Sequence, residues 1–173
     1  DPDLQAAHAS CPWLVVWDDH EVENDYAGSI SENNDEPAWF LKRRAAAYQA
    51  YYEHMPLPRT MVPFGPHLRL HTRLHYGQLA DLHLLDNRQY RSPQPCPRPG
   101  RAGSAVIRDC TSRQDPKATM LGARQEQWLA ANLRASEARW NLLGQQTLMA
   151  QADGEPGPGQ AFFSDGWDGY PAA

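Results

Sequence analysis

The pattern of apolar and polar positions predicts several strands separated by helices. Residues 13–17, WLVVW, form a continuous apolar run, which is typical of a strand covered on both faces. Residues 67–77 alternate leucines with polar side chains, and residues 80–88 follow after a Gly77-Gln78 turn, so we expect an antiparallel strand pair. Residues 139–150, RWNLLGQQTLMA, predict one more strand.

Three segments have the spacing and flanking residues of helices. Residues 36–56 predict the longest helix, with Asp35 as its cap and Pro56 as its stop. Residues 119–136 predict a second amphipathic helix, and residues 1–10 predict a short one that Asp1 caps. Residues 92–119 contain five prolines and predict a long irregular loop. The order of elements predicts a layered α/β or α+β fold without internal repeats.

The charge balance disfavours some classes of partner. Sixteen Lys and Arg residues against 21 Asp and Glu residues give a formal net charge of −5. This balance argues against general binding to nucleic acid or to an anionic membrane surface. No apolar stretch approaches the about 18 residues that a membrane-spanning helix needs.

One short block concentrates acidic side chains directly after the first apolar run. Residues 17–25, WDDHEVEND, contain five acids, which would repel one another at close quarters. Two interpretations remain open: a solvated acidic loop, or a site for a cation such as calcium, magnesium, iron or zinc. The position at a strand exit favours the second, because ligands bind there in α/β sheets.

Other apparent motifs do not fit their usual chemistry. His67, His71 and His75 lie four residues apart, but the leucines between them have strand periodicity, so we expect these histidines on a solvated face. His20-Glu21 lacks the second histidine of a zinc HExxH motif, because Asn24 stands in its place. The sequence contains neither a GxxxxGK[ST] loop nor a GxSxG elbow.

Two of the three cysteines flank the proline-rich loop. A bond between Cys96 and Cys110 would add about 3 kcal/mol of stability in the chain-entropy model and would fit an oxidising compartment. Two free thiols remain the alternative.

Five ordered blocks resemble the PhoD-like alkaline phosphatases, a branch of the calcineurin-like metallophosphoesterases. They are VVWDDHEVENDYAG, RRAAAYQAYYEHMP, LLDNRQYRS, TMLGARQEQWL, and WNLLGQQTLMA with DGWDGY. The resemblance implies that residues 1–173 form the central segment of one catalytic domain, a β-sandwich flanked by helices. It also implies a secreted or periplasmic enzyme with an iron and calcium centre that hydrolyses phosphomonoesters and phosphodiesters, with a small phosphate ester as substrate.

The resemblance assigns roles within the acidic block. Asp19 occupies a metal-bridging position and Asn24 that of a second metal ligand, while Asp18 ligates directly or orients a ligand. His20 stands where a histidine contacts the phosphoryl group, and Asp25 is expected only to support the metal ligands.

Arg88 and Arg91 are candidates for contact with phosphate, because a guanidinium group matches phosphate oxygens. The alternative is an ion pair between Asp86 and one of these arginines at a strand end. We expect Trp128 and Trp140, like Trp167, to lie in the core.

Two blocks of the family are absent from these 173 residues: a GDxxY-like block upstream and a GDxH-like block downstream. We therefore expect N- and C-terminal parts of the same domain to be missing, the fold to be incomplete at both ends, and the isolated segment to be inactive. Two alternatives are a non-catalytic remnant that kept the scaffold and a calcium-binding module.

Overall fold

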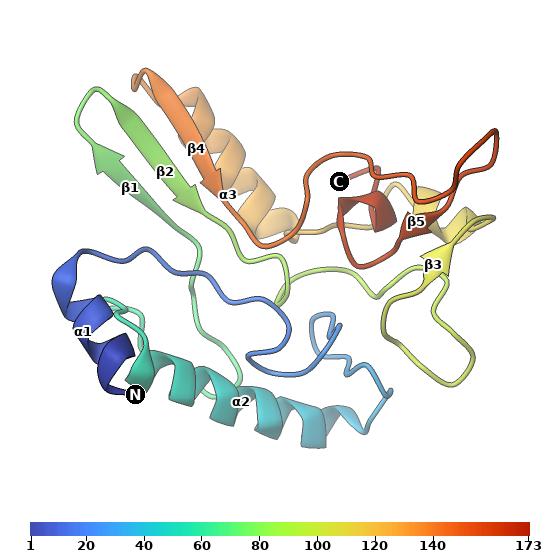
Figure 1. Cartoon of the computed structure of the whole chain (residues 1–173), viewed down its shortest axis with the longest axis horizontal. Coiled ribbons are helices and arrows are strands. Elements are labelled where there is room, and N and C mark those ends of the chain that lie inside the picture. The colour runs from blue at the N-terminus through green and yellow to red at the C-terminus, as the bar shows by residue number, and fades with distance from the viewer.

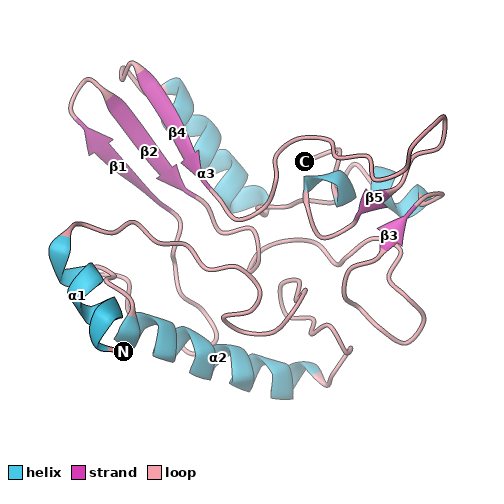
Figure 2. Ribbon diagram, in the orientation of Figure 1, coloured by secondary structure: helices cyan, strands magenta, loops and turns pink.

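A computed structural model describes residues 1–173 and shows helices and small sheets around a loop-rich centre (Figures 1 and 2). The helices are α1 (Pro2–Ser10), α2 (Pro37–His54), α3 (Ala123–Arg134) and the short 3₁₀ helices η1 (Thr111–Gln114) and η2 (Trp167–Gly169). The strands are β1 (Thr72–Tyr76), β2 (Ala80–Leu84), β3 (Val106–Ile107), β4 (Trp140–Gly144) and β5 (Phe162–Phe163). The predicted mixed α/β class is confirmed.

Three strands form the larger sheet in the order β1-β2-β4. β1 and β2 pair antiparallel, with Leu74 opposite Leu82, which confirms the predicted strand pair. β4 pairs parallel with β2, as expected for two strands that a helix connects, and α3 lies beside the sheet (Figure 1). β3 and β5, which the sequence analysis did not predict, form a separate antiparallel pair.

The predicted solvated positions are confirmed for His67 and His75, which are exposed, whereas His71 is half-buried. Asp81 on β2 is fully buried and accepts hydrogen bonds from Arg73 Nη2 at 2.5 Å and Ser136 Oγ at 2.5 Å. His75 Nδ1 lies 2.6 Å from the same carboxylate. Arg73 and His75 therefore cover a buried charge, and residues 67–71, predicted to belong to this strand, precede β1 as irregular chain.

The apolar run at residues 13–17 is extended but forms no strand, so that prediction is wrong. A strand needs a neighbour for its backbone groups, and no backbone hydrogen bond joins this run to another segment. Trp17 is fully buried and stacks on Tyr48 with ring centroids 4.1 Å apart, whereas Trp13 and Leu14 are exposed. The run is therefore exposed at its start and becomes buried toward Trp17.

Both long helices form near their predicted positions. The side chain of Glu36, not Asp35, caps α2 by accepting the backbone N–H of Trp39 at 2.9 Å. Asp35 instead accepts a hydrogen bond from Ser31 Oγ at 3.0 Å. Asp1 caps α1 as predicted.

The core consists of three separate clusters. The largest joins α2 to residues 17–26 and 68–70, the second lies beneath α3, and the third surrounds Ile107 and Phe162. Trp128 and Trp167 pack against the second cluster, as predicted. Trp140 is 58% exposed, so its predicted core position is wrong, because the face of β4 that carries it has no covering layer.

The loop at residues 92–119 contains only β3 and η1 as regular structure. Cys96 and Cys110 are joined by a disulfide, and Cys11 is free and exposed. None of the helices is long and apolar enough to cross a membrane.

Candidate active site

The acidic block folds into consecutive turns around Asp19. The backbone carbonyl of Asp19 accepts the N–H groups of Val22 and Glu23 at 2.9 and 2.8 Å. Its carboxylate accepts the N–H of His20 at 2.9 Å and that of Asp25 at 2.8 Å. These bonds fix the carboxylate of Asp19, whose side chain is 13% exposed.

His20 and Asn24 form a pair at the surface of these turns. Nε2 of His20 lies 2.8 Å from Oδ1 of Asn24 and 3.9 Å from Oδ2 of Asp19. The bond to Asn24 raises the pKa of His20, and the negative charge of Asp19 acts in the same direction. The exposed imidazole is therefore more often protonated near neutral pH than a free histidine.

Arg88 connects three segments of the chain and is almost fully buried. Its Nε donates to Oδ1 of Asp18 at 2.7 Å, and Nη2 lies 4.0 Å from Oδ2 of Asp19. Nη1 and Nη2 donate to the two carboxylate oxygens of Asp165 at 2.7 and 2.5 Å. Burial lowers the pKa of Arg88, but the bonds and charges of Asp165, Asp18 and Asp19 outweigh it and raise that pKa overall.

Arg91 and Gln94 complete the surroundings of Asp165. Nη1 of Arg91 donates to Oδ1 of Asp165 at 2.8 Å, and Nη2 donates to its backbone carbonyl at 2.9 Å. Gln94 Nε2 donates to the same Oδ1 at 2.6 Å. Burial acts to raise the pKa of Asp165, but the Arg88 hydrogen bond and the charges of Arg91 and Arg88 lower it overall.

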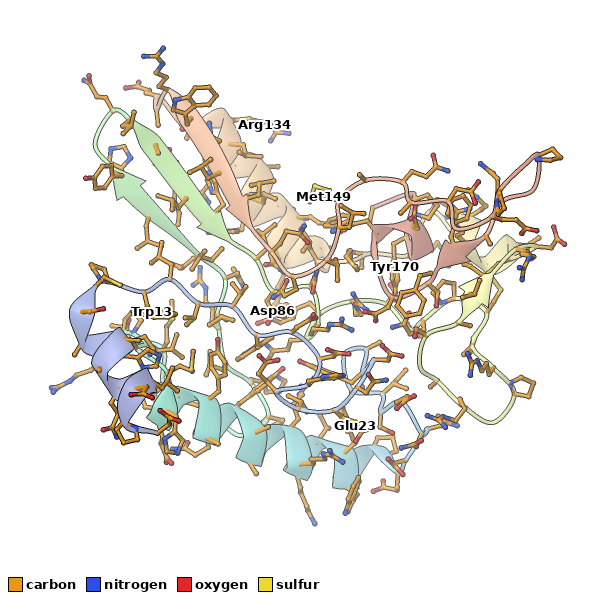
Figure 3. The ribbon with its side chains drawn as sticks, viewed as in Figure 1. Trp13, Glu23, Asp86, Arg134, Met149 and Tyr170 are labelled. Atoms are coloured by element: carbon orange, nitrogen blue, oxygen red, sulfur yellow. A yellow bond between two sulfur atoms is a disulfide. The ribbon has the colours of Figure 1, made fainter.

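Asp86 does not form the ion pair that the sequence analysis considered for it. It accepts Trp17 Nε1 at 3.1 Å and the backbone N–H groups of Arg88 and Gln89, both at 3.0 Å. It forms no ion pair with Arg88 or Arg91, because Asp165 takes that role. Asp86 lies at the centre of the molecule (Figure 3) and ties the acidic block to residues 87–89.

Asp165 and its contacts escaped the sequence analysis. The DGWDGY block was noted only as part of the family resemblance, and no local pattern marked its first aspartate. The signal that could have found it is charge: two arginines in DNRQYR require carboxylates, and Asp165 satisfies both of them.

The structure brings the predicted residues Asp18, Asp19, His20 and Asn24 to one place, where Arg88 holds Asp18 and lies near Asp19. Two of the other three acids of the block, Glu21 and Glu23, have supporting contacts. Glu21 accepts the backbone N–H of Asp18 at 2.9 Å. Glu23 pairs with Arg43 at 2.8 Å.

Three carboxylates could hold a metal ion. One oxygen each from Asp19, Asp25 and Asp165 lie within 4.8 Å of one another. Carboxylate oxygens suit a hard cation such as calcium. Asp165 is already committed to Arg88, Arg91 and Gln94, whereas Asp19 and Asp25 accept fewer bonds from this chain. Asp19 and Asp25 therefore fit a hard cation best.

Arginine side chains also reduce the repulsion between the negative charges of the acidic block. Arg88 lies against Asp18 and Asp19, and Arg43 pairs with Glu23, so their charges compensate part of the negative charge of the block without a cation. Every nitrogen of Arg88 contacts a carboxylate, which leaves little room for direct contact with a phosphate.

The chain is similar to known proteins in sequence and in overall structure. The sequence model of a family described as PhoD-like phosphatase matches residues 1–173. Alkaline phosphatase D of Bacillus subtilis (strain 168) is 46% identical over 172 residues, which are 99% of this chain and 28% of that protein. A solved structure titled "Structure of PhoD" superposes with a TM-score of 0.92 at 45% identity, over 99% of this chain and 32% of the solved chain.

Proposed function

Because the chain belongs to the PhoD-like phosphatase family, we propose that its Asp19 and His20 form part of a metal-dependent site that hydrolyses phosphomonoesters and phosphodiesters. The observation that carries this proposal is the convergence of Asp18, Asp19 and Asp165 on Arg88. It joins three distant parts of the sequence directly beside His20 and Asn24.

In this proposal Asp19, with Asp18 and Asn24 near it, holds the metal. Oxygen donors fit the calcium of the family-implied pair, whereas the iron would draw on donors other than His20. A bound divalent cation lowers the pKa of a bound water and polarises phosphoryl oxygens. The backbone N–H of Asp25 maintains the turns through its bond to Asp19, and the carboxylate of Asp25 is a further donor beside that of Asp19.

His20 supplies the positive charge that faces the substrate. Asn24 orients its ring and raises its pKa, so that the imidazolium can stabilise charge on a phosphoryl oxygen or protonate the leaving oxygen. Its side chain is 76% exposed, which leaves it accessible to a small phosphate ester.

We assign Arg88 and Arg91 a positioning role. Both guanidinium groups are buried and bonded to Asp165, so they hold the acidic block in place instead of reaching a phosphate through free donors. This arrangement corresponds to the ion-pair alternative of the sequence analysis, with Asp165 in place of Asp86.

The test measures turnover by the natural chain that contains these residues, after that chain has been loaded with metal. Replacing His20→Ala should lower the turnover of a phosphomonoester at least tenfold while bound metal, measured by elemental analysis, stays unchanged. Unchanged turnover, or loss of the metal with it, would refute the role given to His20.

A calcium-binding module without catalysis is the second candidate, because the carboxylates of Asp19, Asp25 and Asp165 converge. Two measurements distinguish these functions. Calcium binding in calorimetry, together with no hydrolysis of any phosphate ester in an activity assay, would favour the module.

The disulfide supports export of the protein. Disulfides persist in oxidising compartments, and Cys96 and Cys110 pair here. We therefore propose a secreted or periplasmic location.

A further inference from the structure

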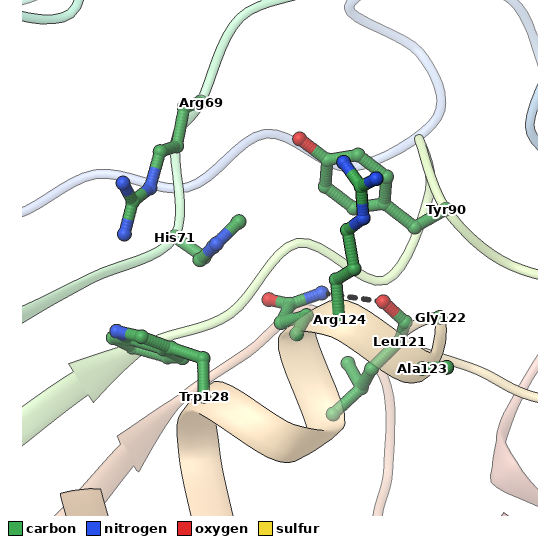
Figure 4. Close-up of a pocket in the computed structure, with 9 residues that line it drawn as sticks. Arg69, His71, Tyr90, Leu121, Gly122, Ala123, Arg124 and Trp128 are labelled. Carbon is green, nitrogen blue, oxygen red and sulfur yellow. Dashed lines mark hydrogen bonds between the residues drawn. The ribbon is translucent and has the colours of Figure 1, made fainter. Parts of the chain in front are cut away.

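A second cavity, separate from the Asp19 site, lies between the start of α3 and the segment that leads into β1 (Figure 4). Its volume is about 560 Å³, within the range of small-molecule sites. Nine residues line it, and none of them is acidic, although the chain as a whole carries a net charge of −5.

Two arginines make this cavity positive. Arg69 and Arg124 are exposed, and neither guanidinium has a carboxylate within ion-pair distance or a hydrogen bond to another side chain. They reach the cavity from different segments, Arg69 from the chain before β1 and Arg124 from the first turn of α3 (Figure 4). Free guanidinium groups bind phosphate oxygens through paired N–H donors.

Aromatic rings form the wall between the arginines. The His71 ring lies 5.1 Å from that of Trp128 and 5.7 Å from that of Tyr90, measured between centroids. Trp128 and Tyr90 are half-buried, and both rings line the cavity. Such rings stack with other planar rings.

One buried polar atom of the wall also lacks a partner within the chain. Nδ1 of His71 is buried and has no hydrogen-bond partner. Burial lowers the pKa of His71 and raises that of Tyr90 to about 12, so both groups are neutral near pH 7 and can donate or accept a hydrogen bond. An unpaired buried polar atom destabilises the fold, and a ligand that forms a hydrogen bond with this atom removes that penalty.

We propose that this cavity binds a phosphate monoester that carries a flat ring, such as a nucleoside monophosphate. Arg69 and Arg124 contact the phosphate, and the ring packs against Trp128 and Tyr90. The proposal concerns binding only and does not depend on catalysis at Asp19.

Calorimetric titration with adenosine monophosphate tests this proposal. A metal chelator is present throughout, so that a metal centre at Asp19 contributes nothing to the heat. Adenosine alone and inorganic phosphate are titrated separately, and each should bind at least tenfold more weakly than adenosine monophosphate, since each makes only part of the contacts.

The double variant Arg69→Gln/Arg124→Gln should bind adenosine monophosphate at least tenfold more weakly. Both side chains are exposed, so the variant keeps its fold, which circular dichroism verifies. Arg134→Gln, at the other end of α3, is the matched control and should bind like the unchanged protein. The proposal is overturned if inorganic phosphate binds as tightly as adenosine monophosphate, or if the double variant keeps its affinity.

Discussion

Asp165 is the residue on which the candidate site depends most, because it neutralises two buried arginines. Breaking a buried ion pair from one side leaves an uncompensated charge. We predict that Asp165→Asn lowers the free energy of unfolding by about 3–5 kcal/mol, measured by urea denaturation. The matched control is Glu155→Gln, whose partner Arg108 is exposed. It should cost at most about 1 kcal/mol, and equal losses in the two variants would contradict the account.

Asp165 should also make the stability of the fold depend on pH. The folded state holds the pKa of Asp165 below its usual value, so the unfolded chain binds the proton more readily. Its contribution is therefore present above about pH 4 and is lost as the pH falls further. We expect the urea midpoint to drop more steeply between about pH 5 and pH 3 in the unchanged protein than in Asp165→Asn. Parallel curves would exclude this linkage.

His20 and Asn24 allow a direct spectroscopic check. Asn24→Ala removes the hydrogen bond that raises the pKa of His20, so the imidazole should titrate at lower pH than in the unchanged protein. Proton NMR of the ring resonances measures this shift. Identical titration curves would show that the pair does not form in solution.

At this scale the sequence could predict that the residues of the acidic block lie close together, but not which distant residues balance their charge. Asp19, His20 and Asn24 lie within six residues, so the turns that unite them follow from local order. Arg88 and Asp165 are separated by 77 positions in the chain. Such a contact depends on the complete tertiary fold, and no periodicity or spacing specifies it.

At the scale of elements, helices were easier to predict than strands. The spacing and caps of α2 are properties of one segment, and its predicted limits hold to within a residue or two. Strands depend on a neighbour: the apolar run at residues 13–17 has none, and the two-residue strands β3 and β5 are too short for a visible alternation.

The disulfide between Cys96 and Cys110 stabilises the loop at residues 92–119. It closes the loop whose Ser104 Oγ donates to Oδ2 of Asp25, so it also restrains the back of the acidic block. We predict that Cys96→Ser/Cys110→Ser loses about 3 kcal/mol of stability in urea denaturation. Cys11→Ser is the control and should leave the urea midpoint unchanged, because Cys11 is free and exposed. A double variant as stable as the control would show that the bond does not form.

On the scale of the whole molecule, three small hydrophobic clusters meet at a polar centre. Asp86, Arg88 and Asp165 occupy that centre and are buried, so charge pairs and hydrogen bonds hold the clusters together where apolar contacts do not. The WDDHEVEND block is attached to this centre through Trp17 and Asp18. The position of Asp19 is thus a property of the entire fold.

The central claim is that Asp19 belongs to a site that hydrolyses phosphate esters. The most direct measurement is the turnover of p-nitrophenyl phosphate by the metal-loaded natural chain that contains these residues, compared with its Asp19→Ala variant. Glu21→Gln, which keeps an acceptor for the N–H of Asp18, serves as the control. We expect Asp19→Ala to abolish turnover with an unchanged circular dichroism spectrum and Glu21→Gln to retain it. Turnover by Asp19→Ala at the rate of the unchanged protein would contradict the account.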